Sequence, residues 1–452
     1  MTKFKKYENY KNTDIVWLNN IPSHWEELPN RYFLKDLKSK VGNNSSQYTL
    51  LSLTKRGVIV RDLSEMKGKF PTEFNSYKIV NEGNLILCLF DIEETPRTVG
   101  LAKNKGMITG AYNVLEINNI NPKFLTYFYI ALDNTKELRS MYRGLRKTIK
   151  IGKFLSIKTP YPSIEEQDKI VNFIEHKEKQ INKLIKKQKK LIELLEEKKK
   201  IVITDAVTKG INKSVLMKDS GVEYIGRVPQ HWEIKKVRQI LKQISKKKIY
   251  NGGIYIGMEN IESWSGKYNT VLNANIEGTS NIFSKGQILF GKLRPYLAKC
   301  IITDCEGLCS SELLVLKPNK DQDVNFIQKV MLSKTFIDLV DASTYGAKMP
   351  RANWNFIRNI ECAIPDITEQ REIIKYINKI DEFINKTIQN KKLLIEKLEE
   401  YKKNLISFAV TGQIDVRDYE FSETDDNIDL EEFENISEDD IETISEVEYA
   451  NN

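Results

Sequence analysis

The sequence contains few of the residues that most often carry catalysis or metal binding. Its 452 residues include three histidines and five cysteines, an odd number that suits a reducing compartment. Cys300, Cys305 and Cys309 lie close together, but no CxxC pair and no neighbouring histidine accompanies them. We therefore expect thiols of buried strands and loops here, and no metal site.

Segments that would direct the chain to a membrane are also missing. No apolar run approaches the roughly 20 residues of a membrane span, and the segment from Met1 to Tyr7 has no apolar core of a signal peptide. We therefore expect a cytoplasmic protein with no membrane partner.

Catalytic signatures are absent as well. We find no GxxxxGK[ST] phosphate loop, no glycine-rich methyl-donor loop and no carboxylate–lysine cluster of a nuclease. Asn121–Phe124 resembles the Asn-Pro-Pro-Phe motif of adenine methyltransferases but lacks its second proline, so we interpret it as a strand-to-helix turn. The sequence predicts a protein that is not an enzyme and has no catalytic residue.

Proline and glycine are missing from two long stretches, which predicts two long helices. Ser163 and Glu166 have the spacing of a capping box, and Asp366 and Glu369 have the same N-cap spacing. Apolar residues recur about every seven positions among Lys and Glu, the pattern of a coiled coil, and a solvated single helix is the weaker alternative. The seam residues are Ile174, Ile181, Leu184, Leu191, Leu195 and Val202, and then Ile377, Ile384, Leu394, Leu398 and Leu405.

The two stretches are copies of one another. Gln167 and Gln370 are 203 positions apart, and the same offset relates Ala206 to Ala409. A constant offset over such a length indicates an internal duplication. If the two seams pack together, chain order makes the helices antiparallel, each roughly 70 Å long.

Charge is distributed unevenly. The net charge is +8, but from Asp415 onward there are sixteen acidic residues and one arginine. Residues 1–414 therefore carry 69 basic and 46 acidic side chains, a net charge of +23. Such a body favours a polyanionic partner, first of all nucleic acid, over a basic protein with no such role. The tail is expected to be disordered, either a solubilising segment or a docking peptide.

The two segments outside the helices share landmarks. Ile21–Trp25 matches Val228–Trp232, where we expect each tryptophan to fill a core and each histidine to satisfy a turn. Strand-like runs follow at 85–90 and 112–117, with a helical stretch at 122–142. The second segment repeats this order at 287–290, 312–316 and 324–340. The residues between these landmarks differ, so we expect one fold with two different surfaces.

The divergent parts contain basic loops. Their arginine and lysine side chains can reach phosphates or guanine, and for any single residue a solvated surface charge is an equal alternative. We expect DNA contacts from Arg97, Thr98, Arg143, Arg146 and Lys147 in the first segment, and from Lys292, Arg294, Tyr296, Lys348 and Arg351 in the second.

Together these residues closely resemble the specificity subunit of type I restriction–modification systems. The resemblance covers residues 1–414 and excludes the acidic tail. It is carried by the two Pro-x-His-Trp motifs, Gly286–Tyr296, Gly346–Arg351, the Gln167 and Gln370 helix starts and the Ala-Val-Thr helix ends.

The resemblance implies an α+β protein with two target-recognition domains, each of which reads half of an asymmetric bipartite site in double-stranded DNA. The helices would separate the domains and bind two methyltransferase (modification) subunits, joined by restriction subunits. S-adenosylmethionine, ATP and magnesium would be bound by those partners and none by this chain. A stand-alone structural DNA-bridging protein remains the alternative. The expected boundaries are 1–162, 163–211, 212–365, 366–414 and 415–452.

Overall fold

The computed structural model describes residues 4–61, 74–142, 147–250, 252–272, 278–344 and 349–420. The chain divides into two compact units. Unit 1 contains the described residues up to Gln188 and those from Leu393 onward, and unit 2 contains those from Lys189 to Lys392. Each unit therefore includes one half of each long helix. We describe the two units separately.

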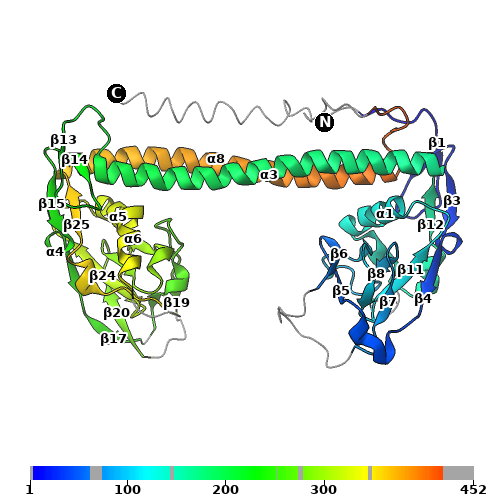
Figure 1. Cartoon of the computed structure of the whole chain (residues 1–452), viewed down its shortest axis with the longest axis horizontal. Coiled ribbons are helices and arrows are strands. Elements are labelled where there is room, and N and C mark those ends of the chain that lie inside the picture. Colours follow the sequence, from blue (N-terminus) through cyan, green and yellow to red (C-terminus); the bar gives the residue numbers. More distant parts are fainter. Residues whose placement is uncertain are drawn as a thin grey trace. The chain divides into compact units, whose positions relative to one another are not determined.

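A four-stranded antiparallel sheet forms the centre of unit 1, in the order β4-β11-β8-β9 (Figure 1). Its inner face packs on α1 (Pro122–Thr135) around Phe124 and Phe128, both fully buried. Asn121 caps α1 by accepting hydrogen bonds from two backbone N–H groups, so the predicted strand-to-helix turn is confirmed. The remaining elements are β1 (Tyr10–Asn12), β2 (Asn20–Pro22), β3 (Glu26–Pro29), β4 (Leu34–Leu37), β5 (Leu51–Thr54), β6 (Gly57–Val60), β7 (Lys78–Val80), β8 (Leu85–Leu87), β9 (Val99–Leu101), β10 (Gly106–Ile108), β11 (Asn113–Ile117), α2 (Ile151–Leu155) and β12 (Lys158–Tyr161).

Unit 2 repeats this frame with the sheet order β16-β24-β21-β22. It differs by an additional five-stranded sheet, β17-β20-β23-β18-β19, where unit 1 has two separate ribbons, β5-β6 and β7-β10. The helical stretch predicted at 324–340 is two helices, because Ser333 is extended and caps the second one. The elements are β13 (Met217–Asp219), β14 (Arg227–Pro229), β15 (Glu233–Lys236), α4 (Val237–Ile240), β16 (Leu241–Ile244), β17 (Lys247–Ile249), β18 (Ile254–Ile256), β19 (Val271–Leu272), β20 (Thr279–Phe283), β21 (Ile288–Gly291), β22 (Cys300–Ile302), β23 (Gly307–Cys309), β24 (Leu313–Pro318), α5 (Val324–Leu332), α6 (Lys334–Ala342), α7 (Trp354–Ile357) and β25 (Glu361–Ile364).

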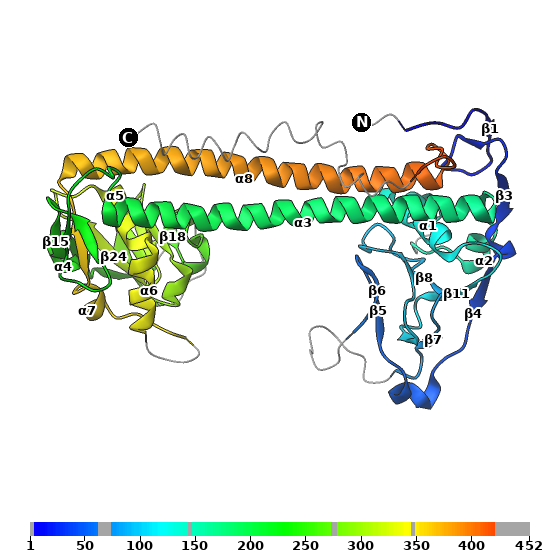
Figure 2. The ribbon, with the colours of Figure 1, turned by 45° about the horizontal axis from the view of Figure 1, so that its top comes forward.

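The two long helices are α3 (Ile164–Lys209) and α8 (Ile367–Val410), of 46 and 44 residues. Within each unit they lie side by side and run in opposite directions (Figure 2). In unit 1, Ile181 and Ile185 of α3 pack on Leu398 of α8. In unit 2, Leu195 of α3 packs on Ile380 and Ile384 of α8.

Hydrogen bonds across the helix pair repeat with the same register as the sequence. The ammonium group of Lys402 lies 3.0 Å from the side-chain oxygen of Asn182 in unit 1. In unit 2, that of Lys199 lies 3.2 Å from the oxygen of Asn385. Both lysines and both asparagines are related by the offset of 203, so the duplication extends to individual side-chain contacts.

The predicted tail boundary at Asp415 is wrong. Residues 411–420 fold back onto unit 1, where Val416 is buried and the Asp415 N–H donates to the Lys5 carbonyl at 2.8 Å. The cause is local apolar and ionic complementarity, which the acidic composition of the whole tail conceals. The remainder of the predicted tail, 421–452, lies outside the described residues.

Candidate nucleic-acid interface

In unit 2 the two predicted DNA-contacting segments are joined by backbone pairing. The Arg294 N–H donates to the Pro350 carbonyl at 2.8 Å, and the Ala352 N–H donates to the Lys292 carbonyl at 2.9 Å. Leu293 and Arg351 form an antiparallel bridge between them. Lys292, Arg294, Tyr296 and Arg351 thus belong to one loop cluster, whereas Lys348 lies outside the described residues.

The side chains of this cluster differ in how firmly they are held. Arg351 donates through Nε and one terminal nitrogen to the two carboxylate oxygens of Glu312, both at 3.2 Å. Tyr296 is 46% exposed, and Arg294 is exposed at the loop surface. The fixed guanidinium and the exposed groups form a surface with both a rigid and an adaptable part.

Unit 1 builds the same loop pair from other residues. The Asp91 N–H donates to the Lys147 carbonyl at 2.9 Å, and the Ile149 N–H donates to the Leu89 carbonyl at 2.7 Å. The Lys147 ammonium pairs with Glu94 at 2.8 Å, an exposed contact that raises the pKa of the lysine. Of the predicted DNA-contacting residues here, Arg143 and Arg146 lie outside the described part of the chain.

Arg97 and Thr98 are predicted to contact DNA from a loop, but in the structure both are held by a buried carboxylate. Both bind Asp133 of α1, Arg97 at 3.0 Å and the Thr98 hydroxyl at 2.6 Å. Thr98 is 1% exposed, so a DNA contact by its side chain is incompatible with this structure. Arg97 neutralises a buried carboxylate, a long-range pairing that a motif search does not reveal.

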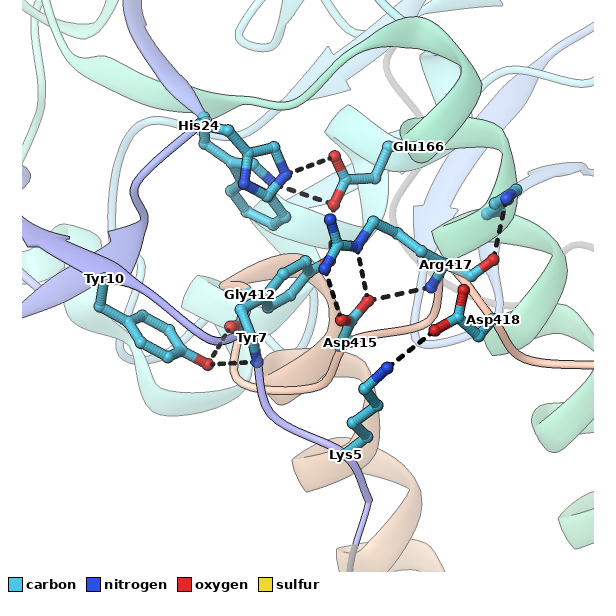
Figure 3. A network of polar contacts seen from close by, with 11 residues as sticks. Lys5, Tyr7, Tyr10, His24, Glu166, Gly412, Asp415, Arg417 and Asp418 are labelled. Carbon is cyan, nitrogen blue, oxygen red and sulfur yellow. Dashed lines mark hydrogen bonds and ion pairs between the residues drawn. The ribbon is translucent and has the colours of Figure 1, made fainter.

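A second polar cluster lies where α3 begins, and Figure 3 shows it. The Glu166 carboxylate accepts hydrogen bonds from the Tyr7 hydroxyl at 2.6 Å and from the Trp25 indole at 3.0 Å, and it lies 3.0 Å from His24 Nε2. The predicted reciprocal half of the capping box is therefore absent, since Glu166 is occupied by these groups. Burial and the adjacent carboxylate raise the pKa of Tyr7.

Unit 2 repeats the cluster in a reduced form. Glu369 lies 2.7 Å from His231 Nε2 and accepts from the Trp232 indole at 3.1 Å, with no tyrosine counterpart among its bonds. The histidines thus do have carboxylate partners, and the expectation that they only satisfy turns is wrong. The sequence signal for this pairing is the recurrence of a glutamate, Glu166 and Glu369, at the same position of both helix starts. These glutamates lie 142 and 138 residues along the chain from their histidines.

The first and last described segments of the chain meet at the cluster in unit 1 (Figure 3). The Tyr10 hydroxyl donates to the Gly412 carbonyl at 3.0 Å, and Lys5 pairs with Asp418 at 2.8 Å. Arg417 donates to both carboxylate oxygens of Asp415 and stacks over the Tyr7 ring. These contacts fasten both ends of the described chain to the start of α3.

In the described ranges, no group of three or more His, Cys, Asp or Glu side chains is placed to hold a metal ion. Burial raises the pKa of Cys309 and of Cys362 to about 12, which disfavours the thiolate that metal binding requires. Over these same ranges no helix has the length and hydropathy to cross a bilayer.

Comparison with known proteins gives relatives of one kind. The MjaVIII type I restriction enzyme specificity subunit of Methanocaldococcus jannaschii is 24% identical over 460 residues, which cover 93% of this chain and 99% of that protein. The EcoDI specificity subunit of Escherichia coli is 26% identical over 196 residues, 41% of this chain and 43% of that relative's length. This chain is a relative of the type I specificity subunits.

The fold agrees with this relationship. A solved chain from work on complex assembly and conformational transition of the type I R-M system has a TM-score of 0.59 at 11% identity. The match covers 87% of this chain and 99% of that one. No protein-family model matches the chain.

The structure gives a physical role to the helix-start motif on which the specificity-subunit resemblance rests. Gln167 is fully buried, accepts from the Asn121 N–H at 2.7 Å and donates to the Pro162 carbonyl at 2.9 Å. Gln370 makes the same two contacts, with Asp323 and Pro365. Each glutamine therefore ties the long helix to the first turn of α1 or α5.

Proposed function

We propose that the chain is the DNA sequence-specificity subunit of a type I restriction–modification complex. Each unit would read one half of a bipartite site in double-stranded DNA. The observation that carries the proposal is the repeated frame with divergent loops. Both units have the same central sheet order, and their loop pairings are related by an offset of 203, yet the loop side chains differ. Different loops on one frame imply two different half-sites.

The charge of the chain supports a DNA partner. A net charge of +23 over residues 1–414 favours binding to phosphates, with displacement of counterions. Lys292, Arg294, Tyr296 and Arg351 are gathered in one cluster and are the contacts we propose for the second half-site. For the first half-site we retain Lys147 as a phosphate contact, which would exchange its carboxylate partner for DNA.

The long helices supply the spacer and docking platform of this proposal. The antiparallel pairing in each unit buries the apolar seams of both helices, and the charged faces remain for partner subunits. Two methyltransferase subunits would bind there and methylate adenine at N6 with S-adenosylmethionine. Restriction subunits would add ATP- and magnesium-dependent chemistry, and this chain would take no part in bond making.

The test is a comparison of methylated adenines in cells that express the methyltransferase subunit with and without this chain. We expect a bipartite, asymmetric motif that depends on the chain, and stoichiometric co-purification of the two proteins. An unchanged methylation pattern and a chain that purifies alone would favour the stand-alone DNA-bridging protein.

A further inference from the structure

Asp91 and Arg294 occupy equivalent positions in the two units. They are 203 residues apart, and the N–H of each donates to a carbonyl in the paired loop, Lys147 for Asp91 and Pro350 for Arg294, which are also 203 apart. The carbonyl of each accepts from the N–H three residues later, in Glu94 and Leu297. The two loops therefore share one backbone conformation although their sequences differ.

That conformation is unfavourable for Arg294, whereas aspartate adopts it more readily than most residues other than glycine. Asp91 has φ 45° and Arg294 has φ 51°, in the left-handed region. Arginine rarely adopts this region, and a following proline disfavours helical conformations further. Such backbone strain typically costs about 1–3 kcal/mol and is concentrated at functional sites. A glycine would fit both positions without strain.

The side chains at these positions are exposed and have no polar partner among the described residues. In the described ranges neither the Asp91 carboxylate nor the Arg294 guanidinium has a hydrogen bond or ion pair. Other charges nearby are paired, Glu94 with Lys147 and Glu312 with Arg351. At this position each loop thus presents an exposed, unpaired charge, negative in unit 1 and positive in unit 2.

The sign of each charge restricts what it can contact on DNA. An arginine can bind a phosphate or donate to O6 and N7 of guanine, whereas a carboxylate is repelled by phosphates. The groups on DNA that a carboxylate can bind are base amino groups, of which the cytosine N4 amino group is the usual partner. An aspartate kept at this position therefore points to base reading rather than to backbone contact.

We infer that Asp91 and Arg294 are the same base-reading position of the two units, and that Arg294 reads a guanine while Asp91 reads a cytosine. The inference rests on the proposed function and deepens it, because it names one base in each half-site and the residue that selects it. The inverted charge is what makes the two half-sites differ at this position.

The experiment replaces each residue by glycine in the complex with its methyltransferase subunit and determines the methylated motif. Asp91→Gly and Arg294→Gly remove the side chain and relieve the backbone, so both variants keep the thermal midpoint. We expect each to lose about 10- to 100-fold of discrimination at one base, the cytosine for Asp91 and the guanine for Arg294, in opposite half-sites. Asp91→Arg should turn the preferred cytosine into guanine.

Matched controls are Glu82→Gln and Lys320→Ala, which change exposed charges in turns of the same units and should leave the motif unaltered. An unchanged motif in both glycine variants would overturn the inference, and so would an equal loss in both half-sites. The proposed function fails in a different way: the wild-type complex would then yield no motif that depends on this chain.

Discussion

Replacement of Glu166 by alanine should destabilise unit 1 more than the equivalent change at Glu369 destabilises unit 2. The Glu166 side chain is 6% exposed and accepts from two donors that the fold buries, the Tyr7 hydroxyl and the Trp25 indole. The Glu369 side chain is 20% exposed and has one such donor, the Trp232 indole.

The magnitude follows from the number of donors left without an acceptor. An unsatisfied buried donor costs about 1–3 kcal/mol. Two donors predict a loss of about 4 kcal/mol in the free energy of unfolding of unit 1 for Glu166→Ala. One donor predicts about 2 kcal/mol in unit 2 for Glu369→Ala. Both histidines are half-exposed and can bind water instead, so they add little to either value.

The assay is hydrogen exchange read by mass spectrometry, because it reports the two units separately. Amides of α1 report on unit 1 and those of α5 on unit 2, and Glu166→Gln serves as the variant that keeps one acceptor oxygen. Equal losses of protection in the two single variants, or a loss below about 1 kcal/mol for Glu166→Ala, would refute the donor-counting argument.

Three further predictions concern other parts of the chain. Truncation after Glu420 should leave the midpoint of unit 1 unchanged, whereas truncation after Gln413 removes Val416 and the Asp415 contacts and should lower it by several degrees in calorimetry. Burial and Glu166 raise the pKa of Tyr7, so its contribution to the free energy of unfolding is full below the ordinary tyrosine pKa of about 10. As the pH rises further, that contribution falls by up to about 1.4 kcal/mol per pH unit, and Tyr7→Phe should remove this part of the pH dependence in urea titrations. A four-residue insertion after Gln188 lengthens α3 by about 6 Å, and methylome sequencing should then show a longer gap between unchanged half-sites; a parental gap would refute the spacer role.

The long helices could be predicted from the sequence because their signals are local. Capping residues, an apolar repeat and the lack of proline and glycine all lie within one segment. Both helices begin one residue after the expected start, α3 ends two residues before the expected boundary, and α8 ends four residues before it. For unit 2 the sequence predicts DNA contacts from two basic loops, and their pairing through Leu293 and Arg351 is seen only in the structure.

Contacts between distant residues could not be predicted. Glu166 was expected to cap its own helix, but it binds Trp25, 141 positions away. Thr98 was expected at the DNA surface, but Asp133 buries it from 35 positions away. In both cases the contact joins an acidic residue to a donor far away in the sequence, and the acidic residue carries no signal of that pairing. Only the recurrence of a glutamate at both helix starts offered a clue.

The meeting of the two chain ends has a consequence for biosynthesis. The described part of unit 2 is one stretch of chain from Lys189 to Lys392, whereas unit 1 needs both the residues before Gln188 and those after Leu393. A ribosome therefore releases all of unit 2 before it has made the segment that completes unit 1. Although domains are usually finished from the N-terminus onward, we expect unit 1, which starts first, to be completed last. Until then the apolar surface that Val416 covers and the Lys5 carbonyl that accepts from Asp415 wait for residues 411–420.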